Sequence, residues 1–225
     1  MNNIMKYLSD LESNNNREWY HANKKQYQEA NTEFEQLIDE LIFSIGKFDS
    51  SIVHNIPKEL TFKLVRDTRF SNDKSPYNPT FRAHISSAGK LPVPVGYFIS
   101  IAPGNRSFLG GGLFASMFKD ATTMIRDYIV GHGNEFESII RNKDFLECFS
   151  VKGEALKNTP RGYDDTHPQA EYLKNKSWYL EYPIADILFE TKDDFLKQAT
   201  KIFHKMKPFN DYLNKALKGF QMPIR

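Results

Sequence analysis

The sequence has 225 residues, of which 40% are hydrophobic and 14% aromatic, so it carries enough apolar side chains for a packed core and is not typical of a disordered chain. Its 30 lysines and arginines nearly balance 28 aspartates and glutamates, and the formal net charge of +2 argues against a dedicated nucleic-acid-binding domain, which is usually strongly basic. We expect one α+β domain over residues 1–225, because no repeat or low-complexity linker divides the chain.

A single cysteine, Cys148, excludes an intramolecular disulfide and favours a reducing cytoplasm. Its aromatic neighbours, Phe145 and Phe149, favour a buried thiol over a nucleophile. The first residues, MNNIMKYLSDLES, lack the apolar core of a signal peptide. The longest uncharged segment, residues 91–105, is interrupted by prolines and is therefore not a membrane helix. We predict a cytoplasmic protein with no membrane partner.

The first part of the chain has helical periodicity. In residues 31–45, apolar side chains recur at the i, i+3, i+4 spacing and predict a helix that stops at Gly46. The preceding segment, NNNREWYHANKKQYQEA, predicts another helix, capped by one of the three asparagines Asn14, Asn15 and Asn16.

After Pro57 the period changes to that of strands. Apolar and polar residues alternate over 60–66, 80–86, 97–102 and 178–182, and residues 107–109 are a further candidate strand. Short Pro-, Gly-, Asn- and Ser-containing connections favour antiparallel neighbours, since parallel pairing needs a long crossover. We predict an α+β fold with a central, mainly antiparallel sheet of about four to six strands, flanked by long N-terminal and C-terminal helices.

Helical periodicity returns from Ser116 and ends at Gly131 or Gly133, and residues 135–141 predict a further short helix. The C-terminal part predicts two helices. One carries its apolar stripe from Phe195 to Met206, and the next starts at Pro208, where the first helical turn tolerates proline.

The stretch RDTRFSNDKSPYNPTFRAH concentrates positive charge between the first two expected strands. Arg66, Arg69, Lys74 and Arg82 lie in it, with only two aspartates as internal partners. A hairpin between residues 60–66 and 80–86 would bring these guanidinium groups together, an arrangement suited to a carboxylate or a phosphate.

Arg82 and His84 alternate with apolar residues and therefore point to the face of the sheet opposite the core. His84 is the group in this set that can exchange a proton near neutral pH. A second form of the hypothesis is therefore an enzyme that acts on the bound phosphate- or carboxylate-bearing compound. The competing interpretation is structural: Arg66 with Asp67, or Arg69 with Asp73, would form ion pairs that hold a loop. The residues alone leave both interpretations open.

Three consecutive glycines, Gly110, Gly111 and Gly112, precede the helix expected near Ser116. Glycine permits close backbone approach, and a helix N-terminus offers free N–H groups to an anion, so Gly111 and Gly112 are candidate ligand contacts. The alternative, which glycine statistics favour, is a tight turn at a sheet edge. The surrounding residues match neither a nucleotide P-loop nor a dinucleotide-binding fingerprint.

Other chemistry is not indicated. The six histidines show no metal-binding spacing and Cys148 has no cysteine partner, so we predict no metal site. The sequence assigns no catalytic residue, no cofactor and no oligomeric state, and therefore does not decide whether the protein is an enzyme.

Several long blocks resemble one family. KELTFKLVRDTRFSNDKSPYNPTFRAHIS, GYFISIAPGNRSFLGGGLF and HPQAEYLKNKSWYLEYPI are similar to a widespread family of bacterial and fungal proteins described only as a conserved domain of unknown function, as are NNNREWYHANKKQY and MKPFNDYLNKAL. Family members often have Phe at the position of Tyr20 and Ile-Tyr at Leu64-Val65. The resemblance covers nearly the whole chain and implies that residues 1–220 or so form the complete module. It carries no established activity, so no catalytic role follows from it.

These observations predict that the protein binds a small phosphate- or carboxylate-bearing ligand at a basic, open sheet face. The expected ligand-binding residues are Arg66, Arg69, Lys74, Tyr77, Arg82, His84, Gly111 and Gly112. The alternative is a nucleic-acid or protein interaction module without catalytic activity, in which Phe70 and Tyr77 stack on bases beside the arginines. Nucleic acid is the less favoured partner because the overall charge is nearly balanced.

Overall fold

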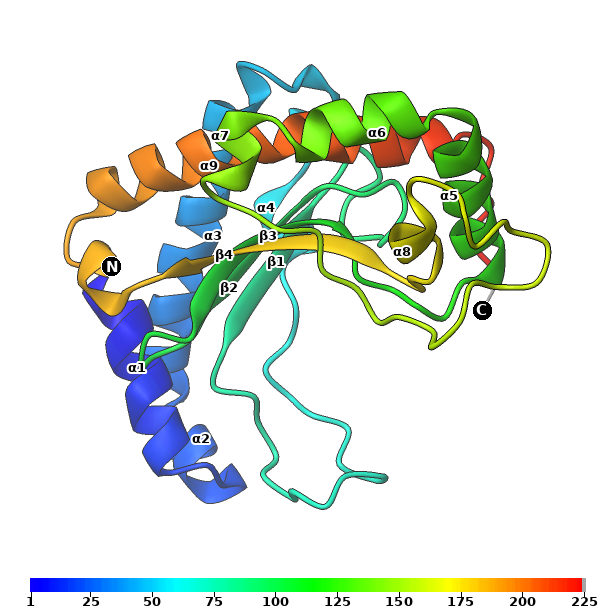
Figure 1. Ribbon diagram of the computed structural model, residues 1–225. Helices are drawn as coiled ribbons and strands as arrows, with labels where there is room; N and C mark the ends of the chain where they lie inside the picture. The colour runs from blue at the N-terminus through cyan, green and yellow to red at the C-terminus, as the bar shows by residue number, and fades with distance from the viewer. Residues whose placement is uncertain (224–225) are drawn as a thin grey trace.

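The structure, a computed structural model, describes residues 1–223 and has one antiparallel sheet with helices packed on it (Figure 1). The helices and 3₁₀ turns are α1 Asn2–Ser13, α2 Arg17–Ala22, α3 Lys24–Gly46, η1 Ser50–Ile52, α4 Pro57–Leu60, α5 Lys119–Gly131, α6 Gly133–Ile140, α7 Lys143–Leu146, α8 Ala170–Leu173, η2 Asp186–Phe189 and α9 Lys192–Ala216. The strands are β1 Phe81–Ile85, β2 Tyr97–Ile101, β3 Ser107–Leu113 and β4 Trp178–Ile184. The predicted α+β class with a mainly antiparallel sheet is confirmed.

The four strands lie in the order β1-β2-β3-β4, and each is antiparallel to its neighbour. Arg82 pairs with Ser100, and Ser100 pairs with Phe108. Because side chains directly opposite one another in neighbouring strands point to the same face, this register places these three side chains in one row across β1, β2 and β3.

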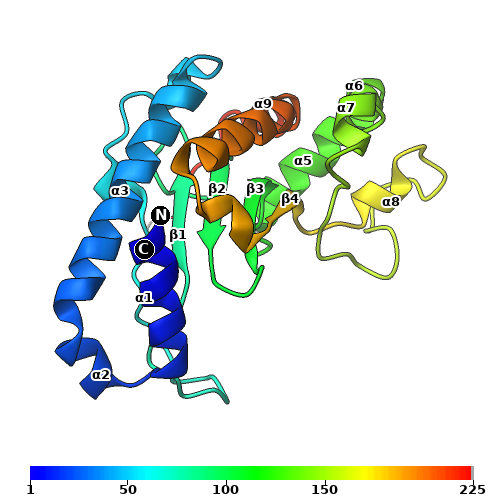
Figure 2. The ribbon, with the colours of Figure 1, turned by 90° about the vertical axis from the view of Figure 1, so that its left-hand side faces the viewer.

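One face of the sheet is the core face. The Phe81 ring of β1 stacks on Phe34 of α3 with 5.1 Å between centroids, and Tyr97 of β2 lies 5.3 Å from Phe203 of α9. In Figure 1, α9 crosses above the sheet, whereas the segment between α4 and β1 extends below it; Figure 2 shows α3 beside β1 and α9 above the strands. Within residues 1–223, no helix packs across the opposite face of the sheet. We call it the uncovered face, and loop segments border it.

The strand predicted over 60–66 is wrong. The first residue closes the helical turn α4, and the rest forms only the isolated bridges Thr61–Ala83 and Val65–Tyr77. The burial does alternate, with Leu64 buried and Val65 63% exposed, but the backbone pairs at isolated bridges only, so no continuous strand forms. The segment still runs beside β1, because the Phe62 N–H donates to the Arg82 carbonyl at 2.9 Å.

The two C-terminal helices predicted around Pro208 are one helix, α9, with Pro208 in its interior. Proline removes one backbone hydrogen bond and costs about 3 kcal/mol in a helix interior. The buried stripe continues in register across it, from Phe203 and Met206 to Phe209 and Leu213. Packing of this stripe on the sheet holds the helix together, because tertiary burial outweighs local propensity.

The N-terminal prediction is confirmed in its cap and its end, but its division into two helices is misplaced. The helices separate at Asn23, and residues 24–30, which were assigned to the first helix, are the beginning of α3. Asn16 caps α2 by accepting a 2.8 Å hydrogen bond from the Trp19 N–H, and α3 ends at Gly46. The helix α1, which contacts α3, was not predicted. The predicted short helix near 135–141 and the strand near 178–182 correspond to α6 and β4.

Candidate functional site

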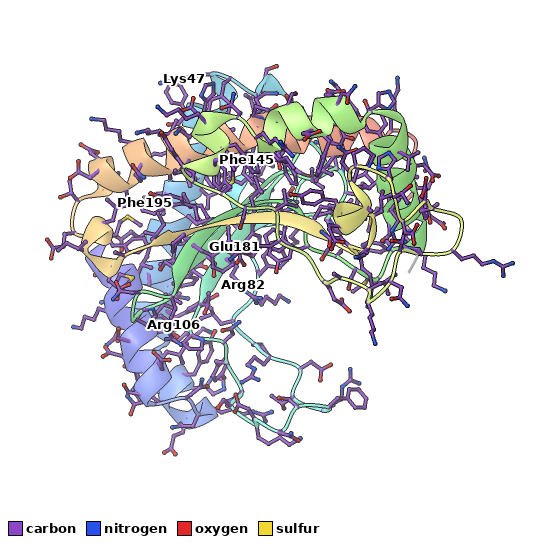
Figure 3. All side chains as sticks on the ribbon, in the orientation of Figure 1. Lys47, Arg82, Arg106, Phe145, Glu181 and Phe195 are labelled. Atoms are coloured by element: carbon purple, nitrogen blue, oxygen red, sulfur yellow. The ribbon has the colours of Figure 1, made fainter. Side chains whose placement is uncertain are left out.

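A pocket of about 660 Å³ lies on the uncovered face of the sheet; we call it the sheet-face pocket. Its lining is Phe62, Asn78, Thr80, Arg82, His84, Lys90, Pro92, Phe98, Ser100, Ala102, Arg106, Phe108, Gly112, Phe114 and Glu181. Figure 3 shows Arg82, Arg106 and Glu181 on the side of the sheet away from α9. The volume is in the range of sites for small organic molecules.

The strand register explains the hollow. Ser100, in the middle of β2, has the large side chains of Arg82 and Phe108 as its neighbours across the strands. Gly110 leaves room for the ring of Phe114, since a Cβ on Gly110 would approach Phe114 Cζ to 2.8 Å. Small residues in the floor and large ones around it produce a concave surface on an otherwise regular sheet.

Aromatic rings form much of the lining. Phe98 is the centre of the group, with its ring centroid 6.3 Å from Phe62, 5.8 Å from Phe108 and 5.6 Å from Phe114. Phe114 also stacks on Tyr179 of β4 at 4.5 Å and remains 39% exposed. These distances are typical of favourable aromatic pairs, so the rings support one another while parts of their surfaces face the pocket.

Among the described residues that line the pocket, Arg82 carries the buried side-chain atom that makes no hydrogen bond. Its Nε is buried and has no hydrogen-bond partner within residues 1–223, and no carboxylate of the same residues lies within 4.0 Å of its guanidinium. The guanidinium carbon lies 5.6 Å from the centre of the Phe62 ring. Burial lowers the pKa of Arg82 below its ordinary value, because the charged form is deprived of water.

The cationic side chains of the pocket differ in whether a carboxylate neutralises them. The Lys90 ammonium lies 6.0 Å from the Phe62 ring and donates a 3.3 Å hydrogen bond to the Thr61 carbonyl. By contrast, Arg106 Nη2 donates to both carboxylate oxygens of Glu12, at 2.6 and 2.7 Å, and Glu181 accepts from Lys152 at 2.7 Å. The cations without a carboxylate partner in the described chain therefore lie at the β1 end.

His84 does not fit the expected role of a proton-exchanging group near neutral pH. The residue is 7% exposed, and this burial lowers the pKa of its imidazole to about 4, with backbone hydrogen bonds to Lys90 and Leu91 opposing the shift. His84 is therefore neutral at pH 7 and forms part of the floor as an uncharged polar group.

The structure does not bring Arg66, Arg69 or Lys74 to Arg82. Arg66 pairs with Asp73, and Arg69 pairs with Asp67 at 2.6 Å. These ion pairs hold the loop, as the structural interpretation expected. The partners differ, however, because that interpretation paired Arg66 with Asp67 and Arg69 with Asp73.

Lys74 donates to the Thr68 carbonyl at 3.0 Å within the same loop. None of these three basic residues lines the sheet-face pocket. The predicted hairpin would have joined the two sets, but the 66–76 loop folds on itself instead.

Tyr77 is 5% exposed and stacks on Tyr20 with 4.2 Å between ring centroids. Its backbone is held by Asn15, whose side chain accepts from the Tyr77 N–H at 3.1 Å and donates to its carbonyl at 2.9 Å. Tyr77 therefore fixes the segment that leads into β1 to the N-terminal helices.

The three glycines are inside β3, paired with β2 and β4, and α5 begins only at Lys119. The helix predicted from near Ser116 to Gly131 is α5 and starts three residues later than expected. The predicted turn at a sheet edge is wrong, because β3 is a central strand. Gly111 faces α9, where a Cβ would lie 3.0 Å from Asn210 Oδ1, whereas Gly112 lines the pocket. Close packing, rather than anion contact, explains Gly111.

Sequence reasoning missed the aromatic lining and Lys90. A signal was present in β2, where Tyr97, Ile99 and Ile101 face the core while Phe98 occupies the other face. A large aromatic residue on the non-core face of an antiparallel strand indicates that this face makes contacts other than with water. Phe62 and Phe114 come from irregular segments, and their convergence depends on the fold.

Residues 1–223 contain neither a cluster of metal ligands nor a candidate membrane-spanning helix. No group of three or more His, Cys, Asp or Glu side chains in this range could hold a metal ion. None of the helices in this range combines the length and apolar character needed to cross a bilayer.

The comparison with family models decides the chain's relationship. Residues 3–212 match the family model described as "Conserved hypothetical protein (DUF2461)", which is nearly the whole chain. The chain belongs to this DUF2461 family. No curated protein and no solved structure matches it. Because the DUF2461 model spans α1 to most of α9, it includes every residue that lines the sheet-face pocket.

Proposed function

We propose that this DUF2461 protein binds a small anionic ligand, bearing a phosphate or a carboxylate, in the sheet-face pocket. The observation that carries the proposal is the Arg82 guanidinium, which is half-buried in the pocket wall without a carboxylate partner among residues 1–223. A buried donor that makes no hydrogen bond costs about 1–3 kcal/mol, and more when the group is charged. A bound oxyanion would supply both the missing acceptor and the missing charge.

The chemistry of the wall supports an anion in particular. A guanidinium presents donors in a planar fork that matches the two oxygens of a carboxylate or a phosphate. Lys90 adds a second cation, near the same Phe62 ring that Arg82 contacts. With Arg106 and Glu181 engaged in their own ion pairs, the anionic group of a ligand would go to Arg82 and Lys90.

The proposal is one of binding. With His84 neutral and Glu181 paired to Lys152, the pocket does not favour a general acid–base pair near pH 7. We further propose a cytoplasmic location, which the single cysteine supports.

The test is a thermal-shift screen of the full-length protein against phosphorylated sugars, nucleotides, mono- and dicarboxylates and inorganic phosphate. A compound that binds the folded state raises the unfolding midpoint by mass action. We expect at least one anion class to raise it, and we expect Arg82→Gln to abolish the shift. Arg69→Gln is the matched control, since Arg69 is exposed and outside the pocket. A screen without any shift, or an equal shift in Arg82→Gln, overturns the proposal.

A second candidate function, interaction with a nucleic acid or a protein, is supported by Phe70. This ring is 95% exposed in the 66–76 loop, 5.8 Å from the Arg69 guanidinium, and a free aromatic ring beside a cation suits base stacking. Binding of a fluorescent single-stranded oligonucleotide should then weaken steeply as salt rises and be lost in Phe70→Ala. Absence of binding at low salt eliminates the nucleic-acid form of this alternative.

A further inference from the structure

We infer that the ligand of the sheet-face pocket is an aromatic anion, in which a ring system of about two fused rings carries the phosphate or carboxylate. This inference rests on the proposed anion site at Arg82 and adds the chemical class of the rest of the ligand. It is carried by the arrangement of Arg82, Phe98 and Phe108 on one face of the sheet and by the ring contacts around Phe98.

The register fixes where the body of such a ligand lies. Arg82 pairs directly with Ser100, which in turn pairs with Phe108. Phe98, two residues before Ser100, is the diagonal neighbour of Arg82 on the same face, a relationship in which Cα atoms are about 7–8 Å apart. A group attached to an anion held by Arg82 therefore extends over Ser100 toward Phe98 and Phe108.

The surface at that position is aromatic. Phe98 and Phe108 are half-buried, their ring centroids are 5.8 Å apart, and Phe114, at 5.6 Å from Phe98, closes the far side. A planar ring entering this space would make stacked or edge-to-face contacts of the kind these rings already make with one another. A sugar makes most of its polar contacts through hydroxyl groups at the edge of its ring, and the three phenylalanines offer no hydrogen-bond partner for them.

The width of the sheet limits the size of the ligand. Arg82 is on β1 and Gly112 on β3, and Glu181 closes the pocket on β4. Strands are spaced by about 4.8 Å, so β1 and β4 are about 14 Å apart. An anionic group at β1 followed by two fused rings spans this distance once the side chains at both ends are included.

The test uses fluorescence anisotropy of three naphthalene probes with the full-length protein. These are 2-naphthyl phosphate, 2-naphthoate and the neutral 2-naphthol, and inorganic phosphate is added as a competitor. We expect at least one of the two anionic probes to bind about tenfold more tightly than 2-naphthol and inorganic phosphate, a difference of about 1.4 kcal/mol for each comparison. Which anionic probe binds better distinguishes a phosphate from a carboxylate head group.

Variants separate this inference from the proposed function. Arg82→Gln should weaken the anionic probes to the level of 2-naphthol. Phe98→Leu keeps apolar volume without a ring and should weaken the naphthyl anions several-fold while leaving displacement by inorganic phosphate unchanged. Phe43→Leu is the matched control, because Phe43 is 71% exposed and outside the pocket. Circular dichroism checks that each variant is folded.

The other outcomes contradict either the aromatic class of the ligand or the anion site itself. If inorganic phosphate binds through Arg82 as tightly as the naphthyl anions, or if Phe98→Leu has no effect, the aromatic class is wrong and the anion site stands. If 2-naphthol binds as tightly as both anions, or if no probe binds and the earlier screen is blank, the proposed function itself is wrong.

Discussion

The side-chain oxygen of Asn210 accepts a 2.8 Å hydrogen bond from the backbone N–H of Gly112, where α9 packs on the core face of β3. The nitrogen of the same amide donates to the Gly96 carbonyl at 3.0 Å, and the residue is 2% exposed. One polar side chain within the apolar stripe of α9 thus bonds the backbone at the start of β2, through Gly96, and the backbone of β3, through Gly112. This contact ties the helix to the strands whose opposite face forms the pocket.

The first prediction concerns this amide. Asn210→Leu should reduce the free energy of unfolding by about 2–4 kcal/mol, because it leaves a buried N–H and a buried carbonyl without partners. Asn214→Leu, one turn later, removes two hydrogen bonds to Val95 at a partly exposed position and should cost less, since water can replace them. Urea unfolding monitored by circular dichroism measures both; equal losses would contradict the special role of Asn210.

The second prediction concerns Gly112, whose φ is +86° and where a Cβ would approach the Trp178 carbonyl oxygen to 2.4 Å. Gly112→Ala should destabilise the protein by about 3 kcal/mol or more, because both the dihedral angle and the backbone contact oppose a side chain. Gly131→Ala is the control: no atom lies within 4 Å of its Cβ position, and the residue is the last of α5. It should be neutral or slightly stabilising. A normal melting temperature for Gly112→Ala would refute the packing explanation.

The third prediction is a pH dependence. The folded state holds the pKa of His84 at about 4, below the ordinary value of 6.5, so the unfolded chain binds more protons between these values. The contribution of neutral His84 is therefore fully present above pH 6.5 and is lost as the pH falls toward 4, by about 3 kcal/mol in total.

His84→Gln should flatten the curve of unfolding free energy against pH in this window, relative to wild type. The exposed His21→Gln should retain the wild-type slope. Urea titrations at pH 7, 5.5 and 4.5 provide the comparison, and identical slopes for wild type and His84→Gln would contradict the burial argument.

The fourth prediction separates a ligand site from a structural charge network at Arg82. Without ligand, Arg82→Met should leave the melting temperature within about 2 °C of wild type or raise it, because a half-buried guanidinium without a carboxylate partner is costly to bury. Thermal melts in a buffer free of phosphate and carboxylates test this. A fall of 8 °C or more, at about 1 kcal/mol for each 2–4 °C, would indicate that Arg82 holds the fold together.

The sequence by itself determined the fold class, because periodicity of apolar residues follows directly from helix and strand geometry. It predicted residues 31–45 of α3, a cap of the preceding helix at one of Asn14, Asn15 and Asn16, the antiparallel connection of the strands and the outward face of Arg82 and His84. It also identified the family, through blocks that the family model matches over residues 3–212. Each of these depends on neighbours that are close in the chain.

Tertiary structure decided the rest. The unbroken course of α9 through Pro208 and the use of three glycines in a central strand depend on what packs against them, namely the sheet and Asn210. The same holds for the site. Arg66 and Arg69 found aspartates within their own loop, while Arg82 came to face phenylalanines from three other segments. Local patterns specify which face a side chain takes, but the groups that meet on that face are set by contacts distant in sequence.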